Sequence, residues 1–231
     1  MRATPWILGF ALLMFGTAGI PADDAKDAQE KKAADSKAAD SKAAEDKKAA
    51  DDQKKGADEG FVRKWLVLAP IALGATESAP DALDKQQIKD EAKLNPKAGD
   101  KVKVGDKELV WKALTSKEDM LDFNAFLGAE TDDSVGYAVT IIVAPEEMKG
   151  VKMKTGSDDQ MKVYLNGKEV IKVTDARPAD TDQDTTEVTL QKGENVLVAK
   201  VINEKVEWKF CVRFCDKADK PIKSLKAKVS E

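Results

Sequence analysis

Apolar residues recur along the last three quarters of the chain in short runs rich in β-branched and aromatic residues, separated by turn signals. This spacing is typical of strands, because amphipathic helices place apolar residues at every third or fourth position. The pattern predicts an all-β, jelly-roll-like β-sandwich over residues 60–231. The expected strands are Phe61–Ala69, Leu109–Leu114, Val135–Ala144, Val151–Lys154, Gln160–Leu165, Lys168–Val173, Thr186–Leu190, Asn195–Asn203 and Glu207–Cys215.

Local signals refine this pattern. Asn166-Gly167 separates two of the runs and predicts a two-residue type I′ hairpin, since both central positions of that turn need positive φ. Two segments favour helix: Asp81–Lys93, which follows Pro80, and one or two turns within Lys117–Phe126. We expect both as insertions between strands.

The N-terminal segment has the features of an export signal. Residues 1–22 combine Arg2, an apolar run from Trp6 to Phe15, and small residues that favour cleavage after Ala18 or Ala22. The apolar run is shorter than the roughly 20 residues of a membrane-spanning helix. We therefore expect a cleaved signal peptide and an exported chain that does not span the membrane, ending in the periplasm, at the cell surface or outside the cell.

Residues 23–59 are almost wholly Ala, Lys, Asp, Glu, Ser and Gln, with a five-residue near-repeat in 33–42. Without Leu, Ile, Val or aromatic residues this stretch has too little apolar surface to form a core. It predicts a low-complexity charged linker, a stalk that is disordered or fluctuatingly helical.

Composition excludes several functional classes. Among 231 residues, 38 Lys and Arg nearly balance 42 Asp and Glu, for a net charge of −4, so nothing favours a nucleic-acid partner. The chain has no histidine, which excludes Ser-His-Asp, Cys-His and histidine-containing zinc sites. Phosphate-binding glycine loops and the G-x-S-x-G elbow are not found either. Hydrolysis by carboxylates alone stays open, but any chain this rich in Asp and Glu offers such pairs, so their presence is not evidence and we expect a protein that is not an enzyme.

Four blocks in order carry a family resemblance: residues 61–70, 156–170, 190–201 and 208–214. The second contains Ser157-Asp158-Asp159 followed by Leu165-Asn166-Gly167-Lys168. Together they resemble secreted planctomycete-type proteins with a galactose-binding-like or PA14-like β-sandwich. The resemblance implies carbohydrate binding. This chain departs from it at Gln160, where those families usually have glycine.

Two acidic segments are candidate calcium sites. In PA14 adhesins, which the second block resembles, adjacent aspartates hold a calcium ion that binds sugar hydroxyls, which implies such a role for Asp158 and Asp159; the alternative is a turn bonded to its own backbone. Asp180, Asp182 and Asp184 alternate as in the first half of an EF-hand loop, but Thr185 and Gln191 occupy its glycine and glutamate positions. An EF-hand is therefore rejected, leaving a weak loop calcium site or a solvated acidic loop.

Aromatic residues could stack on sugar rings, although core packing is favoured for each because their neighbours are apolar. If one is a sugar platform, we expect it to be Trp111 or Tyr164; the other candidates are Trp65, Tyr137 and Trp208.

Cys211 and Cys215 are the only cysteines. Four strand residues span roughly 13 Å, beyond the ~7 Å limit for a disulfide, so two unpaired buried thiols are expected.

The sequence thus predicts a non-catalytic exported binding module that recognises a carbohydrate or cell-envelope component. The alternative is a structural or protein-binding envelope protein without affinity for glycans.

Overall fold

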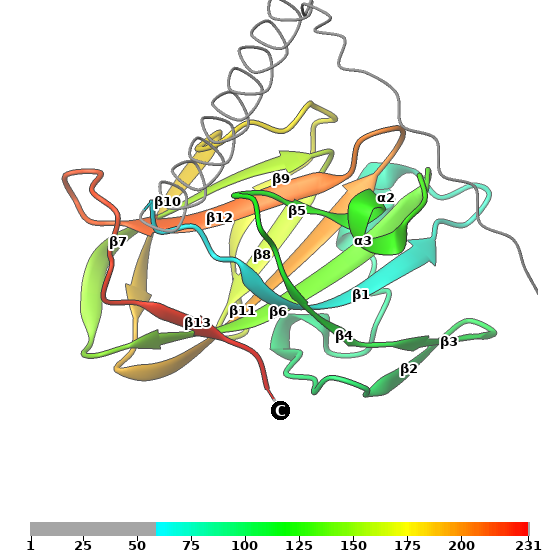
Figure 1. The fold of residues 1–231 in the computed structure, drawn as a ribbon. Coiled ribbons are helices and arrows are strands. Elements are labelled where there is room, and N and C mark those ends of the chain that lie inside the picture. Colours follow the sequence, from blue (N-terminus) through cyan, green and yellow to red (C-terminus); the bar gives the residue numbers. More distant parts are fainter. Residues whose placement is uncertain (1–58, 231) are drawn as a thin grey trace, which may run out of the picture. The chain divides into compact units, whose positions relative to one another are not determined.

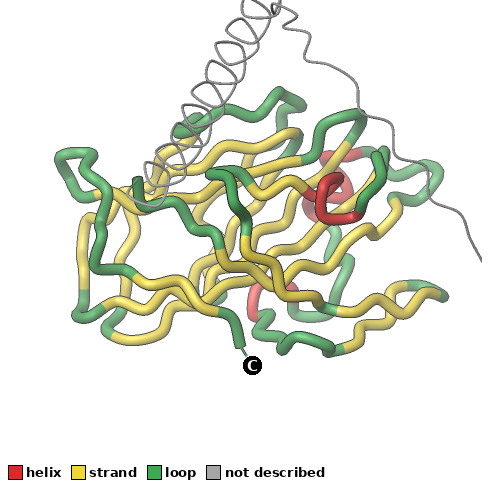
Figure 2. The backbone as a smooth tube through the Cα atoms, viewed as in Figure 1, coloured by secondary structure: helices red, strands yellow, loops and turns green. Residues whose placement is uncertain are grey.

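The computed structural model describes residues 59–230, and their fold is all-β with only short helical pieces (Figures 1 and 2). The predicted signal peptide and nearly all of the linker lie outside the described residues. The strands are β1 (Lys64–Ala72), β2 (Lys101–Val104), β3 (Lys107–Val110), β4 (Lys112–Thr115), β5 (Leu121–Asp122), β6 (Ser134–Ala144), β7 (Met148–Asp158), β8 (Met161–Leu165), β9 (Lys168–Val173), β10 (Asp184–Leu190), β11 (Gly193–Asn203), β12 (Lys209–Cys215) and β13 (Lys226–Lys228).

The strands form two main antiparallel sheets. The larger sheet has the order β4-β1-β6-β11-β8-β9, and β13 pairs with the end of β6 that does not pair with β1. The smaller sheet has the order β10-β7-β12-β5. Hairpin β2–β3 is a separate two-stranded sheet. The prediction of an all-β sandwich is confirmed.

The main core fills the space between the two sheets. Trp65 and Val67 of β1 and Leu197 of β11 meet Met153 of β7 and Phe210 of β12, all nearly inaccessible to solvent. Trp65 packs edge-on against Phe210, with ring centroids 5.1 Å apart. Burial of this apolar surface is the main force holding the sandwich together.

A second core lies on the outer face of the larger sheet, under the insertion of residues 73–111. Leu66 and Leu68 of β1 point to this side, because successive strand residues alternate between faces. They pack against Leu83, Ile88 and Trp111 of the insertion. β1, β6 and β11 are therefore covered on both faces, which explains why their sequences are continuous apolar runs rather than alternating ones.

The predicted helix over Asp81–Lys93 is wrong in extent. Only α2 (Ala79–Asp84) forms, capped by the Ser78 hydroxyl, and the chain turns extended at Lys85 before a single 3₁₀ turn, η1 (Glu91–Lys93). One side chain of the sheet, Lys200, binds the carbonyls at the end of α2, as described below, and this tertiary contact replaces further helical bonding. In the segment Lys117–Phe126, the helix α3 (Phe123–Leu127) starts late, after its cap Asp122.

The predicted strand Leu109–Leu114 is split at Trp111. The Trp111 amide donates to the Asp100 carbonyl at 2.9 Å, and its carbonyl accepts from the Gly99 amide at 2.8 Å. β3 therefore ends in the hairpin, whereas β4 pairs with β1. The hairpin at Asn166-Gly167 is confirmed: φ is 51° and 79°, and β8 pairs antiparallel with β9 across it.

Within the described residues, no helix is both long and apolar enough to cross a membrane.

Candidate functional site

A groove with a cavity volume of about 540 Å³ opens on the insertion, within the size range of small-ligand sites. Its apolar surface comes from Pro70 and Ile71 at the end of β1 and from Leu109 of β3. Its polar surface comes from Glu77, from the tip of hairpin β2–β3 and from residues 85–87. The groove thus combines an apolar strip with hydrogen-bonding side chains.

Glu77 organises the polar side of the groove. Its carboxylate accepts hydrogen bonds from the Gly74 amide at 3.1 Å and the Gln87 side chain at 2.9 Å, and lies 3.0 Å from the Lys85 ammonium. Burial alone would raise the pKa of Glu77, but these donors hold it below its ordinary value. A carboxylate, an amide and an ammonium therefore converge at one wall.

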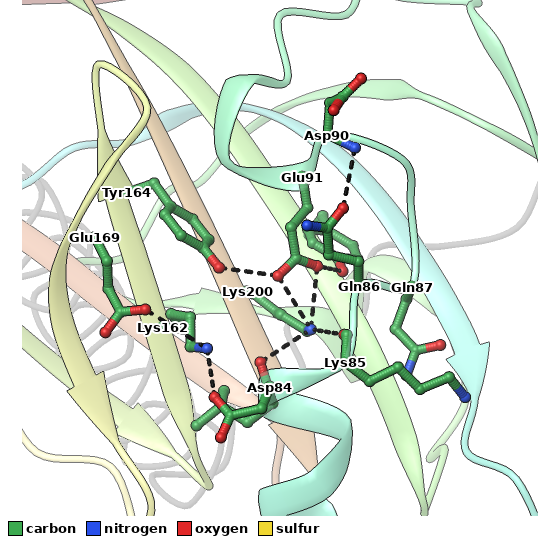
Figure 3. Close-up of polar contacts among 12 residues, drawn as sticks. Asp84, Lys85, Gln86, Gln87, Asp90, Glu91, Lys162, Tyr164, Glu169 and Lys200 are labelled. Atoms are coloured by element: carbon green, nitrogen blue, oxygen red, sulfur yellow. Dashed lines mark hydrogen bonds and ion pairs between the residues drawn. The ribbon is translucent and has the colours of Figure 1, made fainter.

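That wall is held from behind by Lys200 of β11 (Figure 3). The Lys200 ammonium donates to the carbonyls of Leu83 at 3.1 Å and Lys85 at 2.6 Å, at the end of α2. A cation at this place also favours the helix C-terminus, where carbonyls lack intrahelical partners. The backbone of the groove wall is thereby fixed by a side chain from the sheet.

Lys200 is balanced by Glu91 of η1, and both side chains are almost completely buried. The Glu91 carboxylate lies 3.1 Å and 3.4 Å from the Lys200 nitrogen and accepts from the hydroxyls of Tyr137 and Tyr164, the latter at 2.9 Å. Burial lowers the pKa of Lys200, with Glu91 opposing this shift. Burial and then the charge or hydrogen bond of Glu91 raise the pKa of both tyrosines, which remain hydroxyl donors.

The network extends outward along one row of the sheet. Lys200 pairs with Lys162 of β8, which pairs with Lys172 of β9. Like charges at directly opposed positions repel each other. The Asp84 carboxylate offsets this repulsion by accepting hydrogen bonds from Lys162 at 2.7 Å and Lys172 at 2.8 Å. These hydrogen bonds lower the pKa of Asp84 to about 2.

Asp158 and Asp159 lie where the chain crosses from β7 in the smaller sheet to β8 in the larger one. The Ser157 hydroxyl donates to the Asp159 carbonyl at 2.8 Å, and the Asp159 carboxylate accepts from the Glu204 amide at 2.8 Å. Burial, the charge of Asp159 and that of Glu207 raise the pKa of Asp158 to about 6. The Asp159 carboxylate thus binds the backbone of the loop after β11.

The three alternating aspartates are dispersed among different partners. Asp182 pairs with Arg213 and lies 3.3 Å from Lys154, and Asp184 pairs with Arg177. Asp180 accepts from the Thr181 amide at 2.7 Å.

Within residues 59–230, no group of three or more acidic or cysteine side chains is arranged to hold a metal ion. The three alternating aspartates of the expected loop site do not form such a group. Arginines bind Asp182 and Asp184, and backbone amides bind one oxygen each of Asp159 and Asp180.

The prediction of an aromatic platform at Trp111 or Tyr164 is corrected in the same way. Trp111 is 1% exposed in the second core, and Tyr164, 8% exposed, directs its hydroxyl to Glu91. Trp65, Tyr137 and Trp208 are also buried, which confirms their expected core role. Cys211 and Cys215 are free and buried, as expected, and burial raises the pKa of Cys211 to about 12.

Sequence reasoning missed Glu77, Glu91 and Lys200. One signal was present for Lys200, which interrupts the apolar run from Val196 to Ile202. A lysine at the centre of a doubly covered strand needs a buried acid, but the chain offers 42 acidic residues. The partner was therefore not identifiable.

No protein-family model matches the chain, and no curated protein matches it either. The assignment of a function rests on the residues themselves.

Proposed function

We propose that this protein is a non-catalytic exported binding module whose insertion groove takes a short saccharide of the cell envelope or its surroundings. The observation that carries the proposal is the convergence of Glu77, Lys85 and Gln87 beside an apolar strip. Sugars present hydroxyl rims to such polar groups and C–H faces to such strips. The resemblance to galactose-binding-like sandwiches supports the same ligand class.

Preorganisation adds to this argument. Lys200 and Glu91 fix the backbone of residues 83–91 from behind, so the groove wall need not be ordered when a ligand binds. Lys85 shows the division of roles: its carbonyl is bound to Lys200, whereas its side chain, 60% exposed, faces Glu77. The backbone of the wall is held by hydrogen bonds from the sheet, while the Lys85 side chain remains accessible to a ligand.

The test is a glycan-array screen of the full chain, run with calcium and again with chelator. We expect hits that are insensitive to chelator, because the proposed contacts are hydrogen bonds to Glu77, Lys85 and Gln87. In titrations with a hit, Gln87→Ala and Lys85→Ala should each weaken affinity by about tenfold, the value of one hydrogen bond to a charged or amide group. Lys228→Ala, which removes an exposed ion pair with Glu194 outside the groove, is the matched control.

Unchanged affinity in both groove variants would show that the saccharide binds outside the groove. An array without hits would refute the saccharide proposal.

A second candidate, a protein-binding envelope protein, is favoured by the open side of the sandwich. β9 and β10 each pair with a single neighbour, and a hollow of about 350 Å³ lies between them, lined by Val170 and Val188. Edge strands present unpaired amides and carbonyls that an extended peptide can bind. Capture of a strand-forming peptide that is blocked by Val170→Pro would support this candidate.

A further inference from the structure

The buried pair of Lys200 and Glu91 has an arrangement suited to a covalent reaction. Their side chains are 0% and 2% exposed, and the carboxylate oxygens lie 3.1 Å and 3.4 Å from the nitrogen. Both carboxylate oxygens lie within hydrogen-bond distance of the nitrogen, so the two functional groups that would have to join are already in contact.

The hydrogen bonds of Lys200 leave one position of its nitrogen directed at Glu91. The carbonyls of Leu83 and Lys85 accept from two of its N–H groups. The remaining position on the nitrogen, which holds the lone pair in the neutral form, faces Glu91. Passing one proton from the ammonium to the carboxylate turns the ion pair into the amine and the carboxylic acid that the reaction requires.

The hydrogen bonds of Glu91 fit an electrophile. The Tyr137 hydroxyl donates to one carboxyl oxygen and the Tyr164 hydroxyl to the other. Two donors aimed at the same carboxyl group stabilise the negative charge that develops on oxygen when a nucleophile adds to the carbon.

We propose that Lys200 and Glu91 join in an intramolecular isopeptide bond. The Lys200 nitrogen adds to the Glu91 carboxyl carbon, forming the C–N bond, and the C–OH bond then breaks. The hydroxyl group leaves with a proton that originates on the amine and is relayed through a tyrosine hydroxyl, so one water molecule is released. No oxidant, reductant or cofactor is needed.

The bond would connect η1 to β11 across 109 positions of sequence and fix the insertion to the sheet. Neighbouring Lys162 and Asp84 provide an internal comparison. Their nitrogen and oxygen are only 2.7 Å apart, but Asp84 is 58% exposed and accepts from two lysines rather than two phenols. Water at such a site hydrates the charges and favours the ion pair, so we expect no bond there.

The decisive experiment is intact-mass spectrometry of the purified full chain, after folding and prolonged incubation, beside the variant Lys200→Arg. Allowing for the substitution, the wild-type chain should be lighter by the mass of one water molecule. Arginine keeps the charge but has no amine that can form this bond. Equal masses would overturn the proposal.

Peptide mapping locates the bond. Trypsin should release a branched peptide that joins 90–93 to 193–205, because a modified Lys200 is no longer cleaved. A branched peptide containing Asp84 and Lys162 instead would overturn the assignment. In a time course of refolding, Tyr137→Phe and Tyr164→Phe should each slow the loss of water at least tenfold, and an unchanged rate would refute the role of the phenols.

Discussion

Asp158 offers a direct test of how burial and charge act at the crossing between the sheets. Its side chain is largely buried, and burial, Asp159 and Glu207 raise its pKa from 3.8 to about 6. Asp158→Asn keeps the shape and an acceptor oxygen but removes the charge. The variant should therefore be more stable than the wild type wherever Asp158 is ionised.

The size and sign follow from proton linkage. Between pH 3.8 and about 6 the folded chain retains a proton that the unfolded chain has lost, so wild-type stability falls as pH rises through this window. At about 1.4 kcal/mol per pH unit the full effect is about 3 kcal/mol, reduced by any relaxation of the loop. Asp158→Asn should gain about 1–3 kcal/mol at pH 7.5 and close to nothing at pH 4.

Urea denaturation followed by tryptophan fluorescence, repeated from pH 2 to 8, measures this difference. Asp219→Asn is the control of opposite sign, because hydrogen bonds from Lys152 and Lys154 lower the pKa of Asp219 to about 2. That variant should lose stability at neutral pH, and its deficit should shrink as pH falls from 3.8 towards 2. A gain for Asp158→Asn that is the same at every pH would refute the reasoning.

Two further predictions concern the core. Gly136→Ala should destabilise the fold by about 1–3 kcal/mol or more, because its added carbon would lie 2.5 Å from the Phe123 ring and 2.7 Å from that of Trp208. Gly74→Ala, whose nearest contact would be an ordinary 3.4 Å, is the matched control; equal urea midpoints for the two variants would contradict this packing. Cys211 and Cys215 should resist a thiol reagent at pH 8 in the folded protein, since both are buried and the pKa of Cys211 is about 12, and both should react in urea. Rapid labelling of the folded chain would contradict their burial.

The parts of the fold that follow from local chemistry were predictable. Asn166-Gly167 specifies its hairpin because both residues tolerate positive φ, whatever surrounds them. The strands of the sandwich were also found, because doubly buried strands give long apolar runs. The small strands β2, β5 and β13 were missed, since two to four residues carry too little pattern.

Features set by distant contacts were not predictable. Asp81–Lys93 has the composition of a helix, yet Lys200, more than a hundred positions later, binds the carbonyls at the end of α2. Likewise, Asp159, Asp182 and Asp184 have the residue types of a calcium site, and only the fold shows which arginine or amide binds each of them. The residue types in the sequence indicated which interactions these side chains can make, and the folded structure determines which residue each one binds.

The separation of Glu91 from Lys200 has a consequence for how the chain acquires its structure. A protein that emerges from the ribosome or a translocation channel presents its N-terminal part first, so the acid and its insertion appear 109 positions before the lysine. Until β11 arrives, the insertion has neither its cation nor the central strand of the larger sheet. The chain therefore cannot complete this layer before β11 has been made.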